Sequence, residues 1–149
     1  MKSDTLKKIY IDTNVLINYC TGQPTDRAGL DYLFKTRRKE VLFTSSLALV
    51  QTVTNLQTKK PKRKAFTREE TVEAVEKLRK KLTVINLSEN DIVEAVSYQN
   101  TDIEDNVHYV LCRKMKCEAI VTNNVSDFDF FRDIIVLKPE RQLLSLKIK

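Results

Sequence analysis

Short apolar segments alternate along this chain with longer segments in which apolar side chains recur at helical spacing. Segments of this short length, bounded by polar residues, are typical of buried strands; they comprise residues 8–11, 40–44, 83–87, 118–123 and 134–139. Strands separated by helices pair in parallel through right-handed crossovers. The pattern therefore predicts an α/β fold, a three-layer α/β/α domain with a mainly parallel central sheet.

Helices are expected between these strands, and most have a recognisable start. Ser45 or Ser46 can cap a helix over residues 46–57, and Thr67 opens a capping-box sequence, TREE. Ser88 precedes a helix over residues 89–98, and Thr101 or Asp102 caps one over residues 103–114. The apolar positions expected to face inward are Val15, Leu16, Tyr19, Ala28, Leu30, Leu33, Phe34, Val72, Val75, Leu78, Leu82, Val107, Val110 and Leu111.

Length and composition restrict the class of protein. A chain of 149 residues can form one hydrophobic core, so residues 1–149 are expected to form a single domain. No apolar run approaches the roughly 20 residues of a membrane span, and no secretory signal is recognisable, so we expect a cytoplasmic protein without a membrane partner. Cys20, Cys112 and Cys117 lack metal-binding spacing and are expected to be reduced and mostly buried.

Basic residues are concentrated in one segment of a chain whose formal net charge is +6. Residues 59–68, KKPKRKAFTR, contain six basic side chains and no acid, and Pro61 disfavours continuous helix. The segment is therefore expected to be a mobile cationic loop. It is either a solvated charge run or a surface that contacts a phosphate backbone.

Acidic and amide side chains follow the predicted strands, at the sheet edge where ligands bind in open α/β folds. Asp12 ends the first strand, and Asn123, Asn124 and Asp127 follow the fourth. Asp102, Glu104 and Asp105 lie at the start of a helix. Helical spacing places Asp102 and Asp105 on one face and directs Glu104 elsewhere.

Each of these acids also has a purely structural interpretation. Asp12, Asp102 and Asp127 can cap local helices or turns, and Asp105 can interact with a helix dipole. Carboxylates that cluster, however, repel one another unless a divalent cation neutralises them, and oxygen ligands select Mg²⁺ or Mn²⁺. Beside a basic surface, such a site is typical of phosphodiester hydrolysis.

The segments YIDTNVLI, DIEDNVHYVLC, AIVTNNVSDF and IIVLKPE, in this order, resemble the PIN domain family, in particular VapC-like toxin ribonucleases. The resemblance extends from about residue 8 to residue 144. It implies a metal-dependent endoribonuclease that cuts RNA with a water nucleophile, an antitoxin protein as inhibitor, and a homodimer. It assigns Asp12, Asp105 and Asp127 as the metal-binding acids, and Asn14 and Thr122 as the polar residues that orient them.

Two positions depart from the family pattern. Gln51 occupies a place where the family commonly has Glu, and an amide is a poorer ligand for a hard cation and cannot act as a base. Asn124 stands where many relatives have Asp, so Asp127 would act instead. The alternative function is therefore a degenerate PIN domain that binds RNA or protein. An aspartyl-phosphate phosphotransferase is a third interpretation, but Asn14 stands where it needs an acid.

His108 is the single histidine of the chain and lies three residues beyond Asp105. It could act as a general acid, but a histidine beside an apolar helical stripe is usually a packing residue. We therefore expect His108 to be structural.

Overall fold

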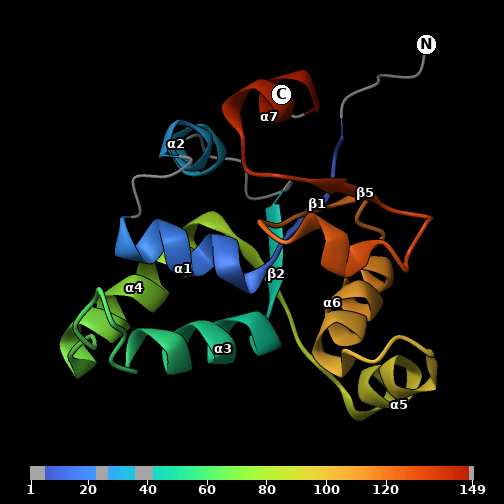
Figure 1. Ribbon diagram of the computed structural model, residues 1–149, viewed down its shortest axis with the longest axis horizontal. Helices are drawn as coiled ribbons and strands as arrows, with labels where there is room; N and C mark the ends of the chain where they lie inside the picture. The colour runs from blue at the N-terminus through green and yellow to red at the C-terminus, as the bar shows by residue number, and fades with distance from the viewer. Residues whose placement is uncertain (1–5, 23–26, 36–41, 148–149) are drawn as a thin grey trace.

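The computed structural model describes residues 6–22, 27–35 and 42–147. In this part of the chain five strands form one sheet in the order β3-β2-β1-β4-β5, and every adjacent pair is parallel. The strands are β1 (Ile9–Ile11), β2 (Leu42–Ser45), β3 (Thr83–Ile85), β4 (Ala119–Val121) and β5 (Ile135–Leu137). The sheet lies between helices (Figure 1), which confirms the predicted α/β/α architecture.

Two hydrophobic clusters cover the two faces of the sheet. The side chains of β1 alternate: Ile9 and Ile11 join one cluster and Tyr10 joins the other. The first cluster packs against α1 (Thr13–Thr21), α2 (Arg27–Lys35), α4 (Arg68–Lys81) and α7 (Arg141–Lys147). The second packs against α5 (Glu89–Ser97) and α6 (Ile103–Lys114). The remaining helix, α3 (Ser46–Leu56), lies beside α1 and α4 (Figure 1).

Local capping explains why most helices begin where the sequence predicts. Ser45 is the N-cap of α3, and its hydroxyl accepts from the Ala48 N–H at 3.1 Å. Thr67 and Ser88 form complete capping boxes at α4 and α5. Asp102 rather than Thr101 caps α6, whose bounds are those predicted. After α1, Gly22 adopts a positive φ of 66°, which glycine tolerates without a steric penalty.

The structure also differs from the prediction in several elements. Val72 does not face inward: its side chain is 48% exposed, because the buried face of α4 consists of Thr71, Ala74 and Leu78 and Val72 points to one side of it. Ala28 is also exposed rather than inward-facing, because α2 buries Gly29, Leu30, Leu33 and Phe34 instead. The strands are shorter than predicted, and the first two residues of the predicted strand 40–44 lie outside the described residues. Helix α7 was not predicted.

The basic segment between α3 and α4 is a tight turn attached to the end of α3. Lys60 and Arg63 pair through their backbones, with N···O distances of 3.0 and 3.3 Å. The Arg63 guanidinium donates to the Asn55 side-chain oxygen at 2.7 Å and to the Leu56 carbonyl at 3.3 Å. Arg63 is thus a structural cation, whereas Lys59, Lys62 and Lys64 are exposed.

In the described part of the chain, none of the helices combines the length and the apolar character that crossing a lipid bilayer requires. The three cysteines are free, and Cys112 and Cys117 are buried as predicted, while Cys20 is half-buried.

Candidate active site

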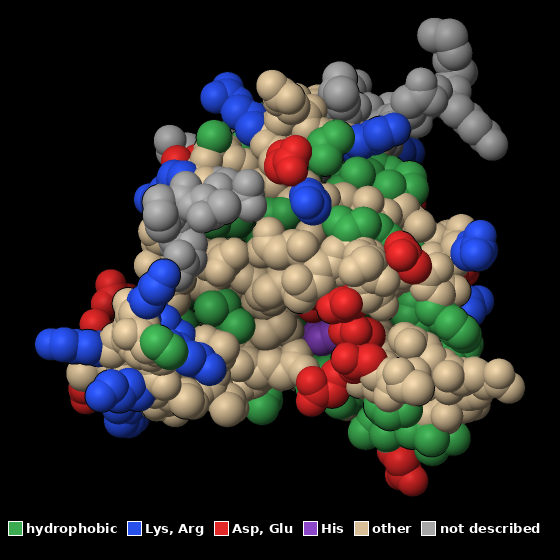
Figure 2. Space-filling view, viewed as in Figure 1, with side chains coloured by type: hydrophobic (Ala, Val, Ile, Leu, Met, Phe, Trp, Pro, Cys, Tyr) green, Lys and Arg blue, Asp and Glu red, His purple; other side chains and the backbone are tan. Residues whose placement is uncertain are grey.

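A groove of about 650 Å³ opens at the carboxyl ends of β1 and β4. The chain runs from β1 to β2 and β3 on one side and returns to β4 on the other, so the groove lies where the strand order reverses, the usual ligand-binding position of open parallel sheets. Acidic side chains lie next to the histidine along one side of this hollow, and basic side chains lie on the same face over α3 and α4 (Figure 2). All three acids assigned from the sequence line the groove, together with Asn14, Gln51, Lys60, Asp102, Glu104, His108 and Asn124.

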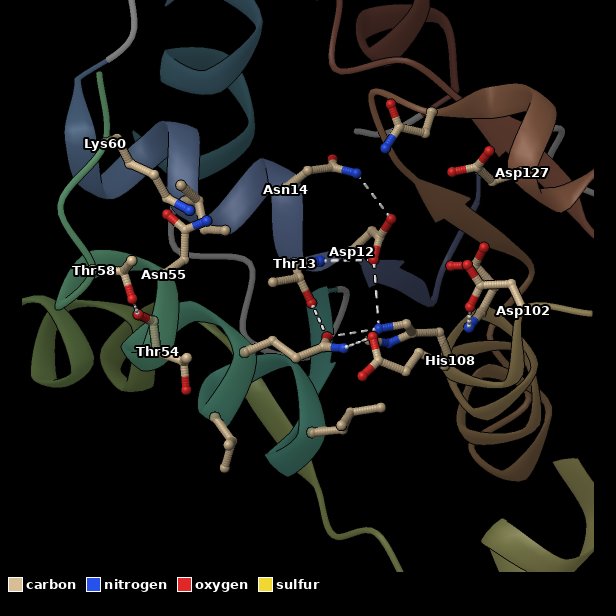
Figure 3. A pocket seen from close by; sticks show the side chains of 17 residues that line it. Asp12, Thr13, Asn14, Thr54, Asn55, Thr58, Lys60, Asp102, His108 and Asp127 are labelled. Atoms are coloured by element: carbon tan, nitrogen blue, oxygen red, sulfur yellow. Dashed lines mark hydrogen bonds and ion pairs between the residues drawn. The ribbon is translucent and has the colours of Figure 1, made fainter. Parts of the chain in front are cut away.

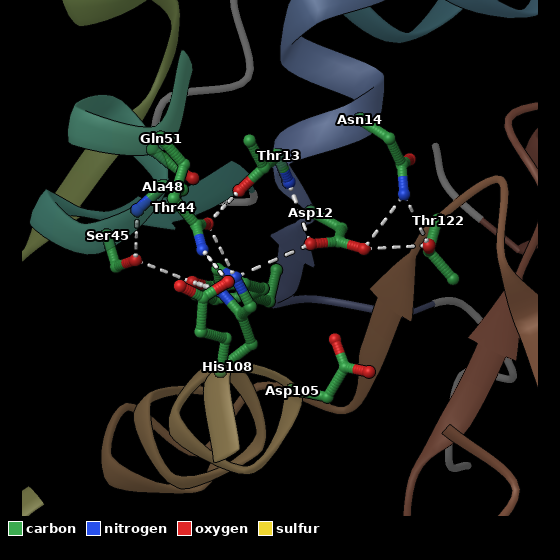
Figure 4. Close-up of polar contacts among 12 residues, drawn as sticks. Asp12, Thr13, Asn14, Thr44, Ser45, Ala48, Gln51, Asp105, His108 and Thr122 are labelled. Atoms are coloured by element: carbon green, nitrogen blue, oxygen red, sulfur yellow. Dashed lines mark hydrogen bonds and ion pairs between the residues drawn. The ribbon is translucent and has the colours of Figure 1, made fainter. Parts of the chain in front are cut away.

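Asp12 lies at the centre of the site and is only 6% exposed. Its Oδ1 accepts the Thr13 N–H at 2.8 Å, so the residue is the N-cap of α1, as the structural interpretation proposed. Its Oδ2 accepts from the Thr122 hydroxyl at 2.8 Å and from the Asn14 side-chain amide at 3.1 Å. Capping uses one carboxylate oxygen, and the second is held by Thr122, directly after β4, and by Asn14 of α1 (Figure 4).

Asn14 and Thr122 are themselves fixed by further hydrogen bonds. The Asn14 Oδ1 accepts from the Asn123 N–H at 3.0 Å, and the Thr122 Oγ1 accepts from the Asn124 N–H at 3.1 Å. Since Thr122 is fully buried, its hydroxyl cannot turn to solvent. These contacts connect the loop after β4 to the start of α1 and determine the orientation of Asp12.

Asp105 and Asp127 enter the groove from different elements. Asp105 is half-buried in the first turn of α6, and Asp127 is exposed on a short 3-10 helix, η1 (Val125–Phe128). Figure 3 shows Asp127 beside the same hollow as Asp12 and Asp102. Burial, followed by the negative charges of Asp102, Asp12 and Asp127, raises the pKa of Asp105 to about 7. The carboxylates therefore repel one another across the groove.

Asn124, not Asp127, is the N-cap of η1.

His108 belongs to a buried chain of hydrogen bonds that the sequence did not indicate. Its Nδ1 lies 2.6 Å from the Tyr10 hydroxyl, which lies 2.6 Å from the Ser45 Oγ. Its Nε2 lies 3.0 Å from the Gln51 Oε1 and 3.7 Å from the Asp12 Oδ1. His108 is buried as expected, but it is hydrogen-bonded on both ring nitrogens and is not simply a packing residue.

These contacts also determine which nitrogen of His108 carries the proton. The Gln51 Oε1 can only accept, so Nε2 carries the hydrogen and Nδ1 accepts from the Tyr10 hydroxyl. The Ser45 hydroxyl then donates to Tyr10. Burial lowers the pKa of His108, although the nearby Asp12 opposes this shift. The ring is therefore neutral near pH 7 and donates toward the Asp12 side of the groove.

Glu104 does not point away from the other acids, as its helical position suggested. Its Oε2 accepts from the Gln51 side-chain amide at 2.8 Å, and it lines the groove with Asp102 and Asp105. The prediction failed because Asp102 is the N-cap, outside the helix, where helical spacing does not apply. In addition, α3 offers the long Glu104 side chain a hydrogen-bond donor.

Several residues of the site could not be assigned from the sequence. Tyr10 appeared to be a core residue of a strand, and Ser45 a helix cap. Thr13 carried no signal, but its hydroxyl donates to the Gln51 Oε1 at 2.6 Å. The one available signal was the polar hydroxyl within an otherwise apolar strand at Tyr10, which needs a partner when it is buried.

Across residues 6–22, 27–35 and 42–147, no group of three or more His, Cys, Asp or Glu side chains lies close enough together to hold a metal ion. The donor chemistry nevertheless fits a hard divalent cation, because the groove is lined by carboxylates, amides and hydroxyls rather than thiols. Burial, and then the neighbouring negative charges, raise the pKa of Asp105, and a cation would neutralise those charges. The residues therefore fit Mg²⁺ or Mn²⁺.

Sequence comparison gives a family for most of the chain. Residues 8–126 match a family model described as a PIN domain. Comparison with curated proteins gives no significant match.

The fold is shared with solved toxin–antitoxin structures. One similar chain comes from the DNA-bound VapBC of Salmonella typhimurium, with a TM-score of 0.63, 17% identity, and coverage of 89% of this chain and 98% of that one. Another is from a Klebsiella pneumoniae toxin–antitoxin complex, with a TM-score of 0.62, 13% identity, and coverage of 89% and 98%. The Mycobacterium tuberculosis VapC20, a Sarcin-Ricin loop cleaving toxin, gives a TM-score of 0.59 and 18% identity over 76% of this chain and 87% of that one. At these identities, the likeness shows the fold alone.

Proposed function

Because this chain belongs to the PIN domain family, we propose that it is a metal-dependent endoribonuclease that hydrolyses phosphodiester bonds of RNA. One observation carries this proposal: carboxylates from three separate segments, at Asp12, Asp105 and Asp127, line one groove where the strand order reverses. Burial, and then the negative charges of Asp102, Asp12 and Asp127, raise the pKa of Asp105, and a bound cation would offset the repulsion among these carboxylates.

Asp12, Asp105 and Asp127 would hold Mg²⁺ or Mn²⁺. When bound, the ion supplies an activated water and neutralises charge on the phosphate. The protein holds Asp12 in one orientation through Thr13, Asn14 and Thr122, so this carboxylate does not have to be ordered when the cation binds. The neutral His108 is buried at the inner side of the groove and presents an N–H toward Asp12 and Gln51.

The groove continues from the acids along α3 to Lys60 (Figure 3). Its far part is lined by Thr54, Asn55 and Thr58, whose hydroxyl and amide groups suit ribose and phosphate oxygens. We propose that the RNA backbone runs along this path toward the basic turn. The product of water attack would carry a 5′-phosphate.

We further propose that the protein is the toxin of a toxin–antitoxin pair, with an antitoxin protein as inhibitor, and that it acts in the cytoplasm as a single-domain subunit of a homodimer. The likeness to the fold of toxin–antitoxin complexes supports this role. A small gene directly upstream that encodes a DNA-binding protein would support it further.

Asp12→Asn tests the activity. Asparagine keeps the N-cap but removes the charge, so the fold should persist. Loss of a residue that only contacts a metal ligand typically lowers activity about 10- to 100-fold. Because Asp12 is itself a proposed ligand, Mn²⁺-dependent cleavage of RNA should fall by more than this. Asp129→Asn is the matched control, because Asp129 is exposed beside η1 and does not line the groove. Unchanged cleavage by Asp12→Asn would contradict the assignment.

Calorimetry separates this proposal from the alternative of a degenerate binding module. The nuclease should release or absorb heat when Mn²⁺ is added, whereas Asp12→Asn should not. Absence of Mn²⁺ binding in the unmodified protein, together with salt-sensitive RNA binding, would favour the module.

A further inference from the structure

The Gln51 side chain connects two sides of the site that have opposite hydrogen-bonding requirements. On one side it meets two donors, the Thr13 hydroxyl at 2.6 Å and the His108 Nε2–H at 3.0 Å, both directed at its Oε1. On the other side its Nε2 donates to the Glu104 Oε2 at 2.8 Å. An amide is the group that can accept on one side and donate on the other.

Other side chains at this position would fail on one of these sides. A carboxylate could accept from Thr13 and His108, but its second oxygen would face Glu104 without a hydrogen between them. An apolar side chain would leave the buried His108 N–H without its nearest acceptor. Gln51 is therefore complementary to Glu104 as well as to His108.

Glu104 is exposed, and the amide of Gln51 is what draws it to the groove. A glutamate in the first turn of a helix can extend freely into solvent. Holding its side chain in one conformation costs side-chain entropy, so a partner must compensate for this loss. Here it is bound across the groove by a residue 53 positions earlier, beside Asp102 and Asp105.

We propose that Glu104, held in the groove by the side-chain amide of Gln51, is a fourth carboxylate of the cation site. The acidic charge that a glutamate on α3 could supply is then carried by α6, and Gln51 is the residue that positions it. This inference rests on the proposed function, because it assigns a further residue to the same cation site. It gives Gln51 a specific role in an active enzyme. The presence of glutamine where the family commonly has glutamate had instead suggested a loss of activity.

The pair can be tested by exchanging its members. Glu104→Gln keeps a hydrogen-bond acceptor for Gln51 but removes the charge, so the Kd for Mn²⁺ should rise about 10-fold. The double variant Gln51→Glu/Glu104→Gln returns the charge to the other helix. In it, the new glutamine donates to the new glutamate, which still accepts from Thr13 and His108. The Kd of the double variant for Mn²⁺ should return to within about 3-fold of the Kd of the unmodified protein.

The measurement is titration of the full-length protein with Mn²⁺ by isothermal calorimetry, with RNA cleavage at saturating Mn²⁺ as a second readout. Glu73→Gln is the matched control, because Glu73 is exposed on α4, outside the groove, and this variant should bind Mn²⁺ like the unmodified protein. Melting temperatures of all variants should agree, since the exchanged atoms are at the surface.

The outcomes separate this inference from the proposed function. If the unmodified protein does not bind Mn²⁺, both fail. If it binds Mn²⁺ and Glu104→Gln binds it equally well, Glu104 is not part of the site, and only the present inference is overturned. If the double variant binds Mn²⁺ as weakly as Glu104→Gln does, the negative charge acts only from position 104 on α6. This result would overturn the proposal that positions 51 and 104 are equivalent.

Discussion

Single residues of this protein combine structural and site roles that would otherwise be treated as alternatives. Asp12 caps α1 through Oδ1 and meets Asn14 and Thr122 through Oδ2. A carboxylate has two oxygens with several acceptor positions, so one role does not exclude the other. An acid that caps a helix at the carboxyl edge of a sheet can therefore also be a candidate ligand.

Asp105→Asn should stabilise the metal-free protein at high pH. The folded pKa of about 7 lies above the ordinary value of 3.8, so the folded state retains a proton that the unfolded state loses. Stability therefore falls as the pH rises from about 4 to about 7, and the penalty is complete above that range. After allowance for solvent screening of this half-buried group, the variant should gain about 1 kcal/mol at pH 8.

Urea unfolding of both proteins with a chelator present, at pH 4 and pH 8, measures this gain. At pH 4 the gain should be much smaller, because Asp105 is then protonated in the folded state and only partly ionised in the unfolded state. Asp129→Asn, which makes the same chemical change outside the groove, controls for the loss of one charge. A gain that is equal at both pH values would contradict the electrostatic explanation.

Tyr10→Phe should destabilise the fold by about 1–3 kcal/mol, because it removes the hydroxyl that donates to the buried His108 Nδ1. Tyr98→Phe removes a surface hydroxyl whose contact with Arg113 is 3.4 Å long, and it should cost less than about 0.5 kcal/mol. Chemical denaturation measures both. Equal losses for the two variants would show that the Tyr10 hydroxyl contributes no more than an exposed one.

At the scale of elements, the ends of helices and strands position the site more than their interiors do. The start of α1, the start of α6 and the loop after β4 meet at one edge of the sheet. The contact between α2 and α7 depends instead on close backbone packing. Gly29 of α2 lies against the Pro139 backbone, just before α7.

Gly29→Ala should therefore destabilise the protein although alanine favours helix. A Cβ at this position would lie 1.7 Å from the Pro139 carbonyl oxygen, so α2 would have to move away from the start of α7. The overpacking should cost about 1–3 kcal/mol, more than the gain of about 1 kcal/mol in helix propensity. Ala28→Ser, at the exposed neighbouring position, is the control, and a melting temperature unchanged by Gly29→Ala would disprove the close contact.

At the scale of the whole molecule, charge is separated along one face. The chain has a net charge of +6, but its acids gather at the groove and its basic turn lies at the far end of α3. Acids alone would repel RNA. A basic surface next to the groove supplies the attraction that brings a phosphate backbone to the cation.

Lys60→Ala/Lys62→Ala should reduce the salt dependence of RNA binding. Each phosphate contact to a single strand contributes about 0.7 to the slope of log K against log salt, so the loss of two contacts should lower it by about 1.4. The control is Lys80→Ala/Lys81→Ala, which removes the same charge where α4 leads into the amino end of β3, at the opposite edge of the sheet. Binding measured with a chelator present avoids cleavage, and equal slopes for both variants would exclude a specific role for the turn.

The sequence alone predicts the strand–helix alternation, the bounds of α6, and the placement of Asp12, Asp105 and Asp127 at one edge of a parallel sheet. These features follow from local rules, namely apolar periodicity, capping and crossover handedness, which act over a few residues or follow from topology. The family resemblance carried by the motifs was likewise available from the sequence alone.

The tertiary structure decided which way Val72 faces, how Glu104 turns, and how Tyr10, Gln51 and His108 connect. The packing of α4 sets the direction of Val72. Hydrogen bonds between residues 53, 57 and 98 positions apart fix the contacts of Glu104, Gln51, His108 and Tyr10. Such bonds form only after helices have packed, because the partner of a buried polar group is set by the neighbouring element and not by its own segment.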